Sequence, residues 1–339
     1  MTQRLTRRAF AGASVAILAA PAVTRAAGPL KIRCSLDTAP SHVRNVSIVD
    51  YLGKVEKASG GRITSEVFHA GSLYADINVG KALLQGQVEM CVPGTWTQTG
   101  LVPDCDFQQL PIFYGQPIEA THKVADGKCG AHVNQQLEAK LRSHVLGPWI
   151  DLGFNNWYTT KTAANSLEDF KGLKIRGSGG AAFGWRIKFA GGVPNVTPWP
   201  NVPLALSQGT FDGLISTDES CTTAKLWEAG VKHSYSDHQV VAQYVPMLNG
   251  AFWSKLAPDD QKMMTQIWAD NIGTYRANVA AAQLKARNTL ESNGVTFVDP
   301  SPADAAAIRR RMMADQDSLI RETKLSPEIV KLATEGFSS

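Results

Sequence analysis

The sequence carries little net charge once its N-terminal segment is set aside. Its 339 residues include 34 lysines and arginines and 30 acidic residues, a formal net charge of +4. Four of the arginines and none of the acidic residues fall within residues 1–26. The rest of the chain is therefore close to neutral. Domains that bind nucleic acid or acidic membranes usually carry a marked basic excess, so the composition argues against both kinds of partner.

The sequence also lacks the residue spacings of metal and catalytic sites. The five cysteines lie far apart without a C-x-x-C pair, and the seven histidines are scattered singly. No nucleophile elbow and no serine, histidine and acid set of recognisable spacing is present. We therefore expect no metal, no cofactor and no catalytic residue. A triad assembled from distant segments leaves no such spacing, so an enzyme acting on an organic acid stays an alternative.

Two roles are open to the cysteines. Cys34 and Cys91 lie in apolar runs and are expected to pack in the core as small hydrophobic residues. In an oxidising compartment one pair, such as Cys105 with Cys129, would be able to form a disulfide. An odd number of cysteines leaves at least one of them free.

One apolar run is present near the N-terminus. Arg7 and Arg8 precede a stretch that is apolar on all faces from about Ala11 to Val23, and small residues follow it. This order is typical of a twin-arginine signal peptide. The run is shorter than the roughly 20 residues that a bilayer span requires. We expect residues 1–26 to direct export, and the mature chain to be periplasmic without stable insertion in a membrane.

The first half of the mature chain alternates predicted strands and helices. Apolar alternation predicts strands at 31–37, 62–71 and 89–94, and longer periodicity predicts helices at 42–61 and 76–87. Right-handed crossovers turn such a β-α-β-α-β unit into a parallel sheet. Ligands of these sheets bind beyond the carboxyl ends of the strands.

A second unit of the same kind begins near Gly153. Its predicted strands are 155–160, 173–177 and 213–217, and its predicted helices are 180–192 and 203–209. Ser166 with Asp169 forms a start signal for a short helical turn. No Gly/Ser-rich or charged linker separates the two units. We therefore predict an α/β fold with two lobes, whose connections are short strands that act as a hinge.

The longest periodic element runs from Pro258 to about Ser292 without an internal proline. Its apolar residues at helical spacing are Met264, Ile267, Trp268, Ile272, Tyr275 and Val279. At 1.5 Å per residue this helix is roughly 50 Å long, which exceeds the width of one lobe. We expect it to run along both lobes. An oligomeric coiled coil is the alternative, although strict a/d spacing is not held.

Arg176 stands at the end of the predicted strand 173–177 and precedes a glycine-rich block. The G-x-G-x-x-A spacing that starts at Gly177 fits a loose dinucleotide-binding pattern. No acidic residue follows before Asp212, so the acid expected about 20 residues on for a ribose is missing. For a lone arginine in this position the ordinary role is an ion pair, with Asp169 or Asp212 as its partner.

Five blocks in order carry a family resemblance. They are ASGGRITSEVFHAGSL, LPIFYG, SLEDFKGLKIRG, ALSQGTFDG and LAPDDQKMM. With them the sequence resembles the DctP-like periplasmic solute-binding subunits of tripartite ATP-independent periplasmic (TRAP) transporters over nearly the whole mature chain. The resemblance implies a two-lobed, hinge-closing protein with a lobe-bridging C-terminal helix. Lobe I would comprise 27–152 plus about 241–275, and lobe II 153–240 plus about 276–339.

The resemblance also implies a ligand anchor. In the family the arginine of the block LKIR meets the carboxylate of the ligand, and Arg176 holds that position. A guanidinium matches two carboxylate oxygens in one plane. The glycines behind it would let the start of the next helix approach the cleft and add N–H groups that favour an anion.

Other family positions differ here. Asn156 falls where many members have a second cleft arginine, which implies a single anchor and a monocarboxylate. Trp199 falls where members place an aromatic ring against the ligand, with an ordinary core tryptophan as the alternative. The block usually read D-G-Q-E-N is DGLIS, so Ser216 replaces a common ligand-contacting asparagine.

Strand ends supply further cleft candidates, each of which also has an ordinary solvated or capping role. These residues are Ser35, Asp37, Thr95, Trp96, Asp218 and Glu219. Tryptophans 96, 157 and 199 near the expected cleft favour an aromatic or apolar acid.

We therefore expect a non-enzymatic periplasmic protein that captures a small organic acid and delivers it to the small and large membrane subunits of a TRAP transporter. A receptor for a sensor protein or for an ATP-driven uptake system has the same binding requirements and stays an alternative.

Overall fold

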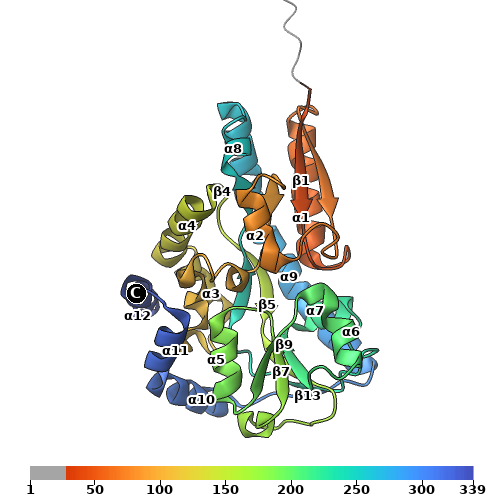
Figure 1. Cartoon of the computed structure of the whole chain (residues 1–339), viewed down its shortest axis with the longest axis vertical. Helices are drawn as coiled ribbons and strands as arrows, with labels where there is room; N and C mark the ends of the chain where they lie inside the picture. The colour runs from red at the N-terminus through yellow and green to blue at the C-terminus, as the bar shows by residue number, and fades with distance from the viewer. Residues whose placement is uncertain (1–27, 339) are drawn as a thin grey trace, which may run out of the picture.

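The computed structural model describes residues 28–338, and the predicted signal peptide at 1–26 lies outside this range. The described chain forms two lobes that follow each other along the long axis of the molecule (Figure 1). Each lobe is built around its own β-sheet, and a two-stranded sheet lies between them. No helix within 28–338 is both long and apolar enough to cross a membrane.

The first lobe contains a five-stranded sheet of order β2-β1-β3-β12-β4. Its strands are β1 (Leu30–Ser35), β2 (Ile63–Phe68), β3 (Met90–Cys91), β4 (Ser143–Val145) and β12 (Met247–Asn249). β1 pairs in parallel with both β2 and β3, as predicted, whereas β12 returns from the second half of the chain and pairs antiparallel with β3 and β4. The helices of this lobe are α1 (Val43–Ala58), α2 (Asp76–Leu84), α3 (Ile118–Ala125), α4 (Lys128–Leu141) and α8 (Gly250–Trp253).

The second lobe contains a six-stranded sheet of order β13-β10-β6-β9-β7-β8. Its strands are β6 (Asn156–Thr159), β7 (Lys174–Gly177), β8 (Val193–Val196), β9 (Gly213–Ser216), β10 (His233–Tyr235) and β13 (Thr296–Val298). β7 runs parallel to β8 and β9, but β6 is antiparallel to β9. The sheet is mixed because β6 leaves the hinge directly and runs away from the first lobe, while β7 and β9 run back towards it.

Helices and short turns complete the second lobe. Its helices are α5 (Ala181–Phe189), α6 (Val202–Ser207) and α7 (Asp218–Thr223). The predicted start signal is present as a capping box, in which Ser166 and Asp169 open a single 3₁₀ turn at Leu167–Phe170. The carboxyl ends of β7 and β9 point towards the first lobe, so residues that follow these strands reach the space between the lobes.

Two antiparallel strands, β5 (Ile150–Phe154) and β11 (Val241–Tyr244), form the predicted hinge. Within β5, Gly153 has φ +118°, a conformation that other residues rarely adopt, and a Cβ there would lie 2.7 Å from the side-chain amide of Gln283. That amide donates a hydrogen bond to the carbonyl of Leu152 at 2.7 Å. The hinge is thereby attached to the long C-terminal helix.

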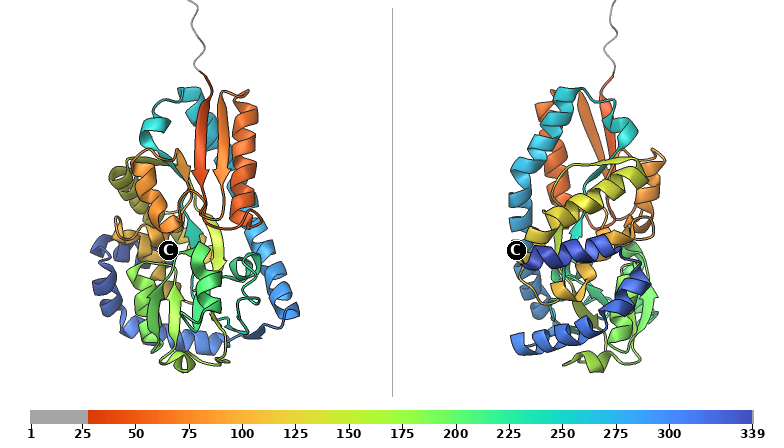
Figure 2. Two further views of the ribbon diagram at one scale, coloured as in Figure 1. Left: turned by 45° about the vertical axis from the view of Figure 1, so that its right-hand side comes forward. Right: turned by 90° about the vertical axis from the view of Figure 1, so that its left-hand side faces the viewer.

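The long helix α9 spans Pro258–Ser292, the bounds that the sequence predicts. It packs against α1 in the first lobe, β5 in the hinge and α7 in the second lobe, and Figure 2 shows it along both lobes. Of the six apolar residues expected on its inner face, five are buried, and Ile267 is partly buried against the same core. The helix therefore uses its apolar face within one chain.

Three helices follow α9 and cross between the lobes. They are α10 (Pro302–Ala314), α11 (Gln316–Thr323) and α12 (Pro327–Ser338). α11 packs against α5 in the second lobe, whereas α12 packs against α3 and α4 in the first. The end of the chain thus contacts lobe I, although the sequence reading assigns residues 276–339 to lobe II.

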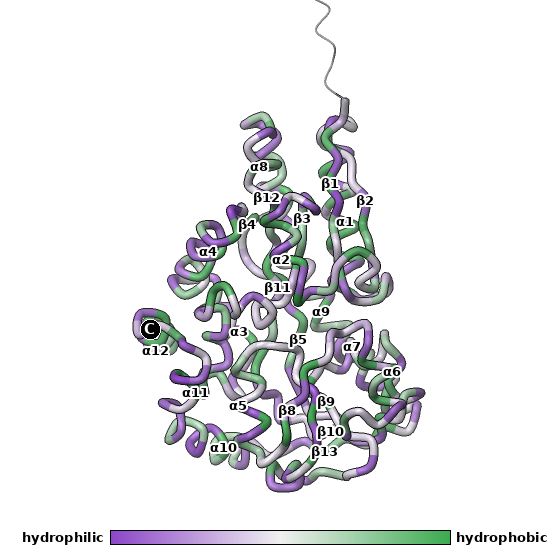
Figure 3. Tube along the Cα trace, viewed as in Figure 1, coloured by the Kyte–Doolittle hydropathy of each residue, from purple (hydrophilic) through white to green (hydrophobic). Residues whose placement is uncertain are grey.

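All five cysteines are buried and free. The disulfide considered between Cys105 and Cys129 is therefore not formed. Burial raises the pKa of Cys129 to about 12 and that of Cys105 well above its ordinary value. Thiols held in this protonated state are poor nucleophiles, and all five serve as packing residues. Figure 3 shows apolar residues both on strands such as β3 and β9 and on helices such as α6.

A buried carboxyl group joins the two halves of the core. Asp237 follows β10 and accepts hydrogen bonds from the hydroxyl of Tyr114 at 2.6 Å and the indole N–H of Trp157 at 2.9 Å. Its other oxygen, Oδ1, is buried without a hydrogen-bond partner. Burial raises the pKa of Asp237 to about 7. Between the pKa of an unfolded aspartate, about 3.9, and the raised pKa of Asp237, the folded protein therefore keeps a proton that the unfolded chain has lost.

We expect the free energy of unfolding of the wild type to fall, relative to that of Asp237→Asn, as the pH rises from 5 to 7. Because the folded state binds the extra proton, the contribution of Asp237 to stability is present below the unfolded pKa and is lost as pH rises through the folded pKa. The difference in the free energy of unfolding should change by at most about 1.4 kcal/mol per pH unit. Denaturant titrations at several pH values measure it.

The control for this experiment is Asp270→Asn, which changes an exposed carboxylate on α9 that accepts a hydrogen bond from Gln266. We expect the control to follow the wild-type pH profile. If the free energies of unfolding of Asp237→Asn and of the wild type changed with pH in the same way, Asp237 would not be protonated in the folded protein.

Candidate functional site

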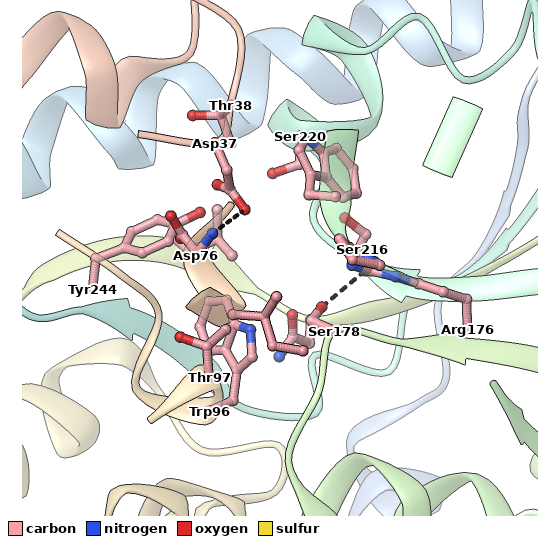
Figure 4. Close-up of a pocket in the computed structure, with 15 residues that line it drawn as sticks. Asp37, Thr38, Asp76, Trp96, Thr97, Arg176, Ser178, Ser216, Ser220 and Tyr244 are labelled. Atoms are coloured by element: carbon pink, nitrogen blue, oxygen red, sulfur yellow. Dashed lines mark hydrogen bonds between the residues drawn. The ribbon is translucent and has the colours of Figure 1, made fainter. Parts of the chain in front are cut away.

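A narrow cavity with a volume of about 40 Å³ lies between the lobes, at the carboxyl ends of β7 and β9 (Figure 4). The first lobe contributes Asp37, Thr38, Asp76, Ile77, Trp96 and Thr97 to its lining. The second lobe contributes Arg176, Ser178, Pro198, Trp199, Ser216 and Ser220. Leu152, Asn155 and Tyr244 come from the hinge region.

Arg176 is the cation of the second lobe in this cavity. Its side chain is 1% exposed. Its Nε donates to the carbonyl of Thr197 at 2.9 Å, and Nη1 donates to the hydroxyl of Ser178 at 2.9 Å. Among residues 28–338 no carboxylate lies within ion-pair distance of it. Arg176 is therefore a buried charge that has hydrogen bonds but no counter-ion.

The two carboxylates considered as its partners are occupied elsewhere. Asp169 accepts the backbone N–H groups of Asn165 and Ser166, and Asp212 accepts the backbone N–H of Lys174. Burial lowers the pKa of Arg176 to about 10, while the nearby carboxylate of Asp37 opposes this shift. The guanidinium stays charged at neutral pH, and an anion in the cavity would offset the cost of burying it.

The glycines that follow Arg176 allow the two lobes to approach each other closely. A Cβ at Gly180, where φ is +75°, would lie 3.0 Å from the carbonyl oxygen of Trp96 and 3.3 Å from the carboxylate of Asp106. Asp106 accepts the backbone N–H of Ala182 at 3.4 Å in the first turn of α5. The carboxylate of Asp106 thus already occupies the start of α5. The structure gives no support to the expectation that N–H groups there bind a ligand anion.

Aromatic side chains form the walls of the cavity. The guanidinium of Arg176 lies 5.5 Å from the ring centroid of Trp199. Trp96 packs edge-on to Phe183 at 6.3 Å and lies 5.6 Å from Tyr244. These rings give the cation an apolar, weakly hydrated surrounding that suits a ligand with an acidic end and an apolar or cyclic body.

An acidic pair of the first lobe faces this cation across the cavity (Figure 4). Asp37 and Asp76 both bind the buried Arg44, at 3.0 and 2.8 Å, and the guanidinium of Arg44 lies 4.1 Å from the ring centroid of Tyr244. Burial raises the pKa of Asp76 to about 8, and the neighbouring Asp37 raises it further while Arg44 opposes the shift. Arg44 is thus compensated within the chain, unlike Arg176.

Two carboxylates cross between the lobes beside the cavity, each to the start of a helix in the other lobe. Glu219 in α7 accepts the backbone N–H of Val43 at 2.6 Å, at the first residue of α1. Asp106 makes the reverse contact to α5. Negative charge is favourable at a helix N-terminus, so both contacts stabilise the arrangement of the lobes in this structure. Burial raises the pKa of each carboxyl to about 7.

Five of the residues predicted from the sequence line the cavity together: Arg176, Asp37, Trp96, Trp199 and Ser216. The other five lie outside its lining, and one of them, Glu219, binds the start of α1. Ser35 donates to the carbonyl of Tyr74, and Thr95 is buried beside Trp96. Asn156 accepts the backbone N–H of His238, and Asp218 accepts the hydroxyl of Tyr158. Asn156 and Asp218 line a separate groove beside α9.

Neighbouring residues take the places of two predicted ones. Asn155 and Thr97 line the cavity instead of Asn156 and Thr95. Asn155 directly precedes β6, where successive residues point to opposite faces. Thr95 and Thr97 lie instead in a 3₁₀ turn, in which residues two positions apart point in different directions. Asp76 was missed as well, although it follows the second strand and opens α2, which is a signal of the same kind as that noted for Asp37.

The described residues contain no group of three or more histidine, cysteine, aspartate and glutamate side chains arranged to hold a metal ion. The residues that line the cavity offer a small molecule charge, hydrogen bonds and apolar contact.

Comparison with known proteins agrees with this arrangement. Residues 38–322 match the model of the bacterial extracellular solute-binding protein family 7. The chain is 28% identical over 296 residues to the C4-dicarboxylate-binding periplasmic protein DctP of Rhodobacter capsulatus, which covers 86% of this chain and 87% of the relative.

Solved structures show the same fold. The sugar acid binding protein of Advenella mimigardefordensis in complex with galactonate superposes with a TM-score of 0.86, at 21% identity, over 92% of this chain and 98% of that one. A TRAP periplasmic solute-binding protein of Desulfovibrio salexigens with bound orotic acid gives a TM-score of 0.84, at 17% identity, over 91% and 98%.

The matched segment includes the hinge strands, Arg176 and the whole of α9. The family resemblance and the two-lobed fold predicted from the sequence are thereby confirmed. The chain belongs to bacterial extracellular solute-binding protein family 7, the non-enzymatic periplasmic solute-binding proteins of TRAP transporters.

Proposed function

We propose that this protein captures a small organic monocarboxylate between its lobes and delivers it to the membrane subunits of a TRAP transporter. The observation that carries the proposal is Arg176, a buried cation in the cavity without a carboxylate partner in the described chain. Its two hydrogen bonds orient the guanidinium, and a ligand carboxylate would supply the missing charge.

The preference for one carboxylate follows from the charges around the cavity. Arg44 is compensated by Asp37 and Asp76, so Arg176 is the cation left for a ligand among the residues that line or adjoin the cavity. A second ligand carboxylate would approach the acidic pair, where like charges repel. The relatives described above bind C4-dicarboxylates, galactonate and orotic acid, which are all organic acids.

The aromatic walls support a ligand with an apolar or cyclic body. Trp96, Trp199 and Tyr244 surround the cavity, and rings pack well against flat or apolar groups. Closure of the lobes removes water from the site, which strengthens the charge-assisted hydrogen bond to Arg176. The bound, closed form would then present the surface that the membrane subunits recognise.

We also propose the moving units. The sequence assigns 27–152 with about 241–275 to lobe I and 153–240 with about 276–339 to lobe II. The two sheets support this division, because β4 and β12 join the first sheet while β6 and β13 join the second. The packing of α12 against α3 and α4 favours its movement with lobe I.

Arg176→Ala is expected to weaken binding of monocarboxylates at least about 30-fold, because it removes the buried charged partner of the ligand. The measurement is calorimetric titration of protein that has been unfolded and refolded to remove carried-over ligand, with a panel of aliphatic and aromatic acids and their amides. Ligand-free Arg176→Ala should not unfold more easily than the wild type, since the lost cation has no counter-ion.

The control is Arg311→Ala, which removes an exposed arginine paired with Glu168. Its affinities should equal those of the wild type. Unchanged affinity in Arg176→Ala, or amides that bind as well as the acids, would show that the carboxylate anchor is wrongly assigned.

Trp199→Ala is expected to weaken aromatic acids more than aliphatic acids of similar size, by a factor of about 2 to 10. The physical reason is loss of the ring beside Arg176, which lies 5.5 Å from the guanidinium. Titration with benzoate and hexanoate gives the two affinities. Trp253→Ala, which removes a ring stacked on His144, serves as the control; equal losses for both acids in Trp199→Ala would contradict a stacking role.

A further inference from the structure

We propose that Ser178 is a second residue that binds the ligand carboxylate, through a hydrogen-bond relay in which its hydroxyl accepts from Arg176 and donates to the ligand. Ser178 is not among the residues that the sequence predicts for the site. Its role rests on the proposed function, since it needs a carboxylate in the cavity. Ser178 would both position the guanidinium and contact the ligand itself.

The bonds that Arg176 already makes decide where a carboxylate is able to bind. Its Nε donates to the carbonyl of Thr197, and the hydroxyl of Thr197 donates in turn to Asn195 at 2.8 Å. With Nε occupied, the planar fork formed by Nε and Nη2 is not free to bind both oxygens of a carboxylate. Among residues 28–338 no group accepts from Nη2. We therefore expect the ligand at the Nη end of the guanidinium, beside Ser178.

The hydroxyl of Ser178 has a hydrogen to spare. A serine hydroxyl donates one hydrogen bond and accepts two. Its oxygen accepts from Nη1 of Arg176 at 2.9 Å, and no group within residues 28–338 accepts its own hydrogen. Ser178 is half-buried and lines the cavity together with Arg176 (Figure 4). A ligand oxygen is thus able to accept from Ser178 without breaking a bond of the chain.

Other hydroxyl groups in the cavity lining are already used as donors. The hydroxyl of Thr38 donates to the side chain of Asn45 at 2.7 Å. The hydroxyl of Thr97 donates to the carbonyl of Gly94, also at 2.7 Å. Both threonines belong to the first lobe, across the cavity from Arg176. Ser178 differs from them because it is bonded to the ligand-binding cation and keeps its donor.

The chain path places this hydroxyl at the one position of the run 177–180 that carries a side chain. Gly179 and Gly180 have φ values of +120° and +75°, which residues with a side chain rarely adopt. A Cβ at Gly177 would lie 2.9 Å from the Cβ of Phe183. Strain or a clash therefore opposes a side chain at each of the three glycines, whereas position 178 accommodates one beside Arg176.

The relay strengthens both of its hydrogen bonds. Hydrogen bonds in a chain polarise one another, so a hydroxyl that accepts from a cation becomes a better donor. Arg176 is buried, and a hydrogen bond is electrostatically stronger in such surroundings than in water. A carboxylate that accepts from Nη2 and from Ser178 would receive two hydrogen bonds that are both linked to the same positive charge.

The first test is calorimetric titration of refolded, ligand-free protein with the acid panel used for Arg176→Ala, which includes benzoate and hexanoate. Ser178→Ala should weaken the acids that the wild type binds by about 10-fold or more, because a hydrogen bond to a charged group is lost. Ser178→Thr keeps the hydroxyl and should restore most of the affinity. The control is Ser207→Ala, an exposed serine of α6 whose hydroxyl donates to the carbonyl of Leu204, and it should bind like the wild type.

The second test places a carboxylate at the same position. Ser178→Asp would give Arg176 a counter-ion within the chain, since the side chain at 178 already contacts Nη1. We expect the ligand-free variant to unfold at a higher temperature than the wild type, and calorimetry to detect no binding of the acids. Acid binding by Ser178→Asp with wild-type affinity would contradict a ligand carboxylate next to Ser178.

The outcomes separate the role of Ser178 from the function on which it rests. Wild-type affinity in Ser178→Ala, while Arg176→Ala weakens the same acids, would overturn the relay and leave the carboxylate site intact. Equal losses in Ser178→Thr and Ser178→Ala would assign the effect to packing and overturn it as well. Unchanged affinity in Arg176→Ala, or amides that bind as well as the acids, would overturn the proposed function and the role of Ser178 with it.

Discussion

The candidate binding site is built around a charge that the described chain leaves uncompensated. Arg176 is removed from water and held by Thr197 and Ser178, yet no carboxylate of the described chain reaches it. Burying a cation without a counter-ion is unfavourable. The surrounding sheet, turn and aromatic rings hold the guanidinium in place, so the stabilisation that it lacks becomes available to a ligand. The second lobe thus holds the guanidinium in a position where an anion would stabilise it.

Arg44 shows the opposite arrangement at a similar depth. It is equally buried, but two aspartates and the ring of Tyr244 surround it. Asp37 and Asp76 therefore offset the free-energy cost of burying Arg44 within the first lobe. Two carboxyl groups share this one cation, and both line the cavity. Because one lobe presents a cation and the other a carboxyl pair, the proposed ligand would contact both lobes at once. Under this proposal, recognition of the ligand and closure of the lobes would be coupled.

The lobes also hold each other without a ligand. Glu219 and Asp106 each bind the start of a helix in the opposite lobe, on two sides of the cavity. The long helix α9 adds a fixed support, since it packs on α1, the hinge strand β5 and α7. The proposed motion of the lobes would fall on the two hinge strands, where Gly153 adopts a backbone conformation that other residues avoid. Such a hinge would allow the lobes to part without disrupting either core.

The sequence by itself determined the elements, the family and the central arginine. Strand alternation, helical periodicity and capping signals are local, so the bounds of α9 and the parallel pairing of β1 with β2 and β3 were predictable. The motif around Arg176 also stood in one continuous block. The tertiary structure alone decided which side chains meet. It placed Asn155 rather than Asn156 in the cavity, because strand faces depend on register. It also neutralised Arg44 and left Asp76 with an unpaired oxygen, because ion pairing and burial depend on residues far apart in the chain.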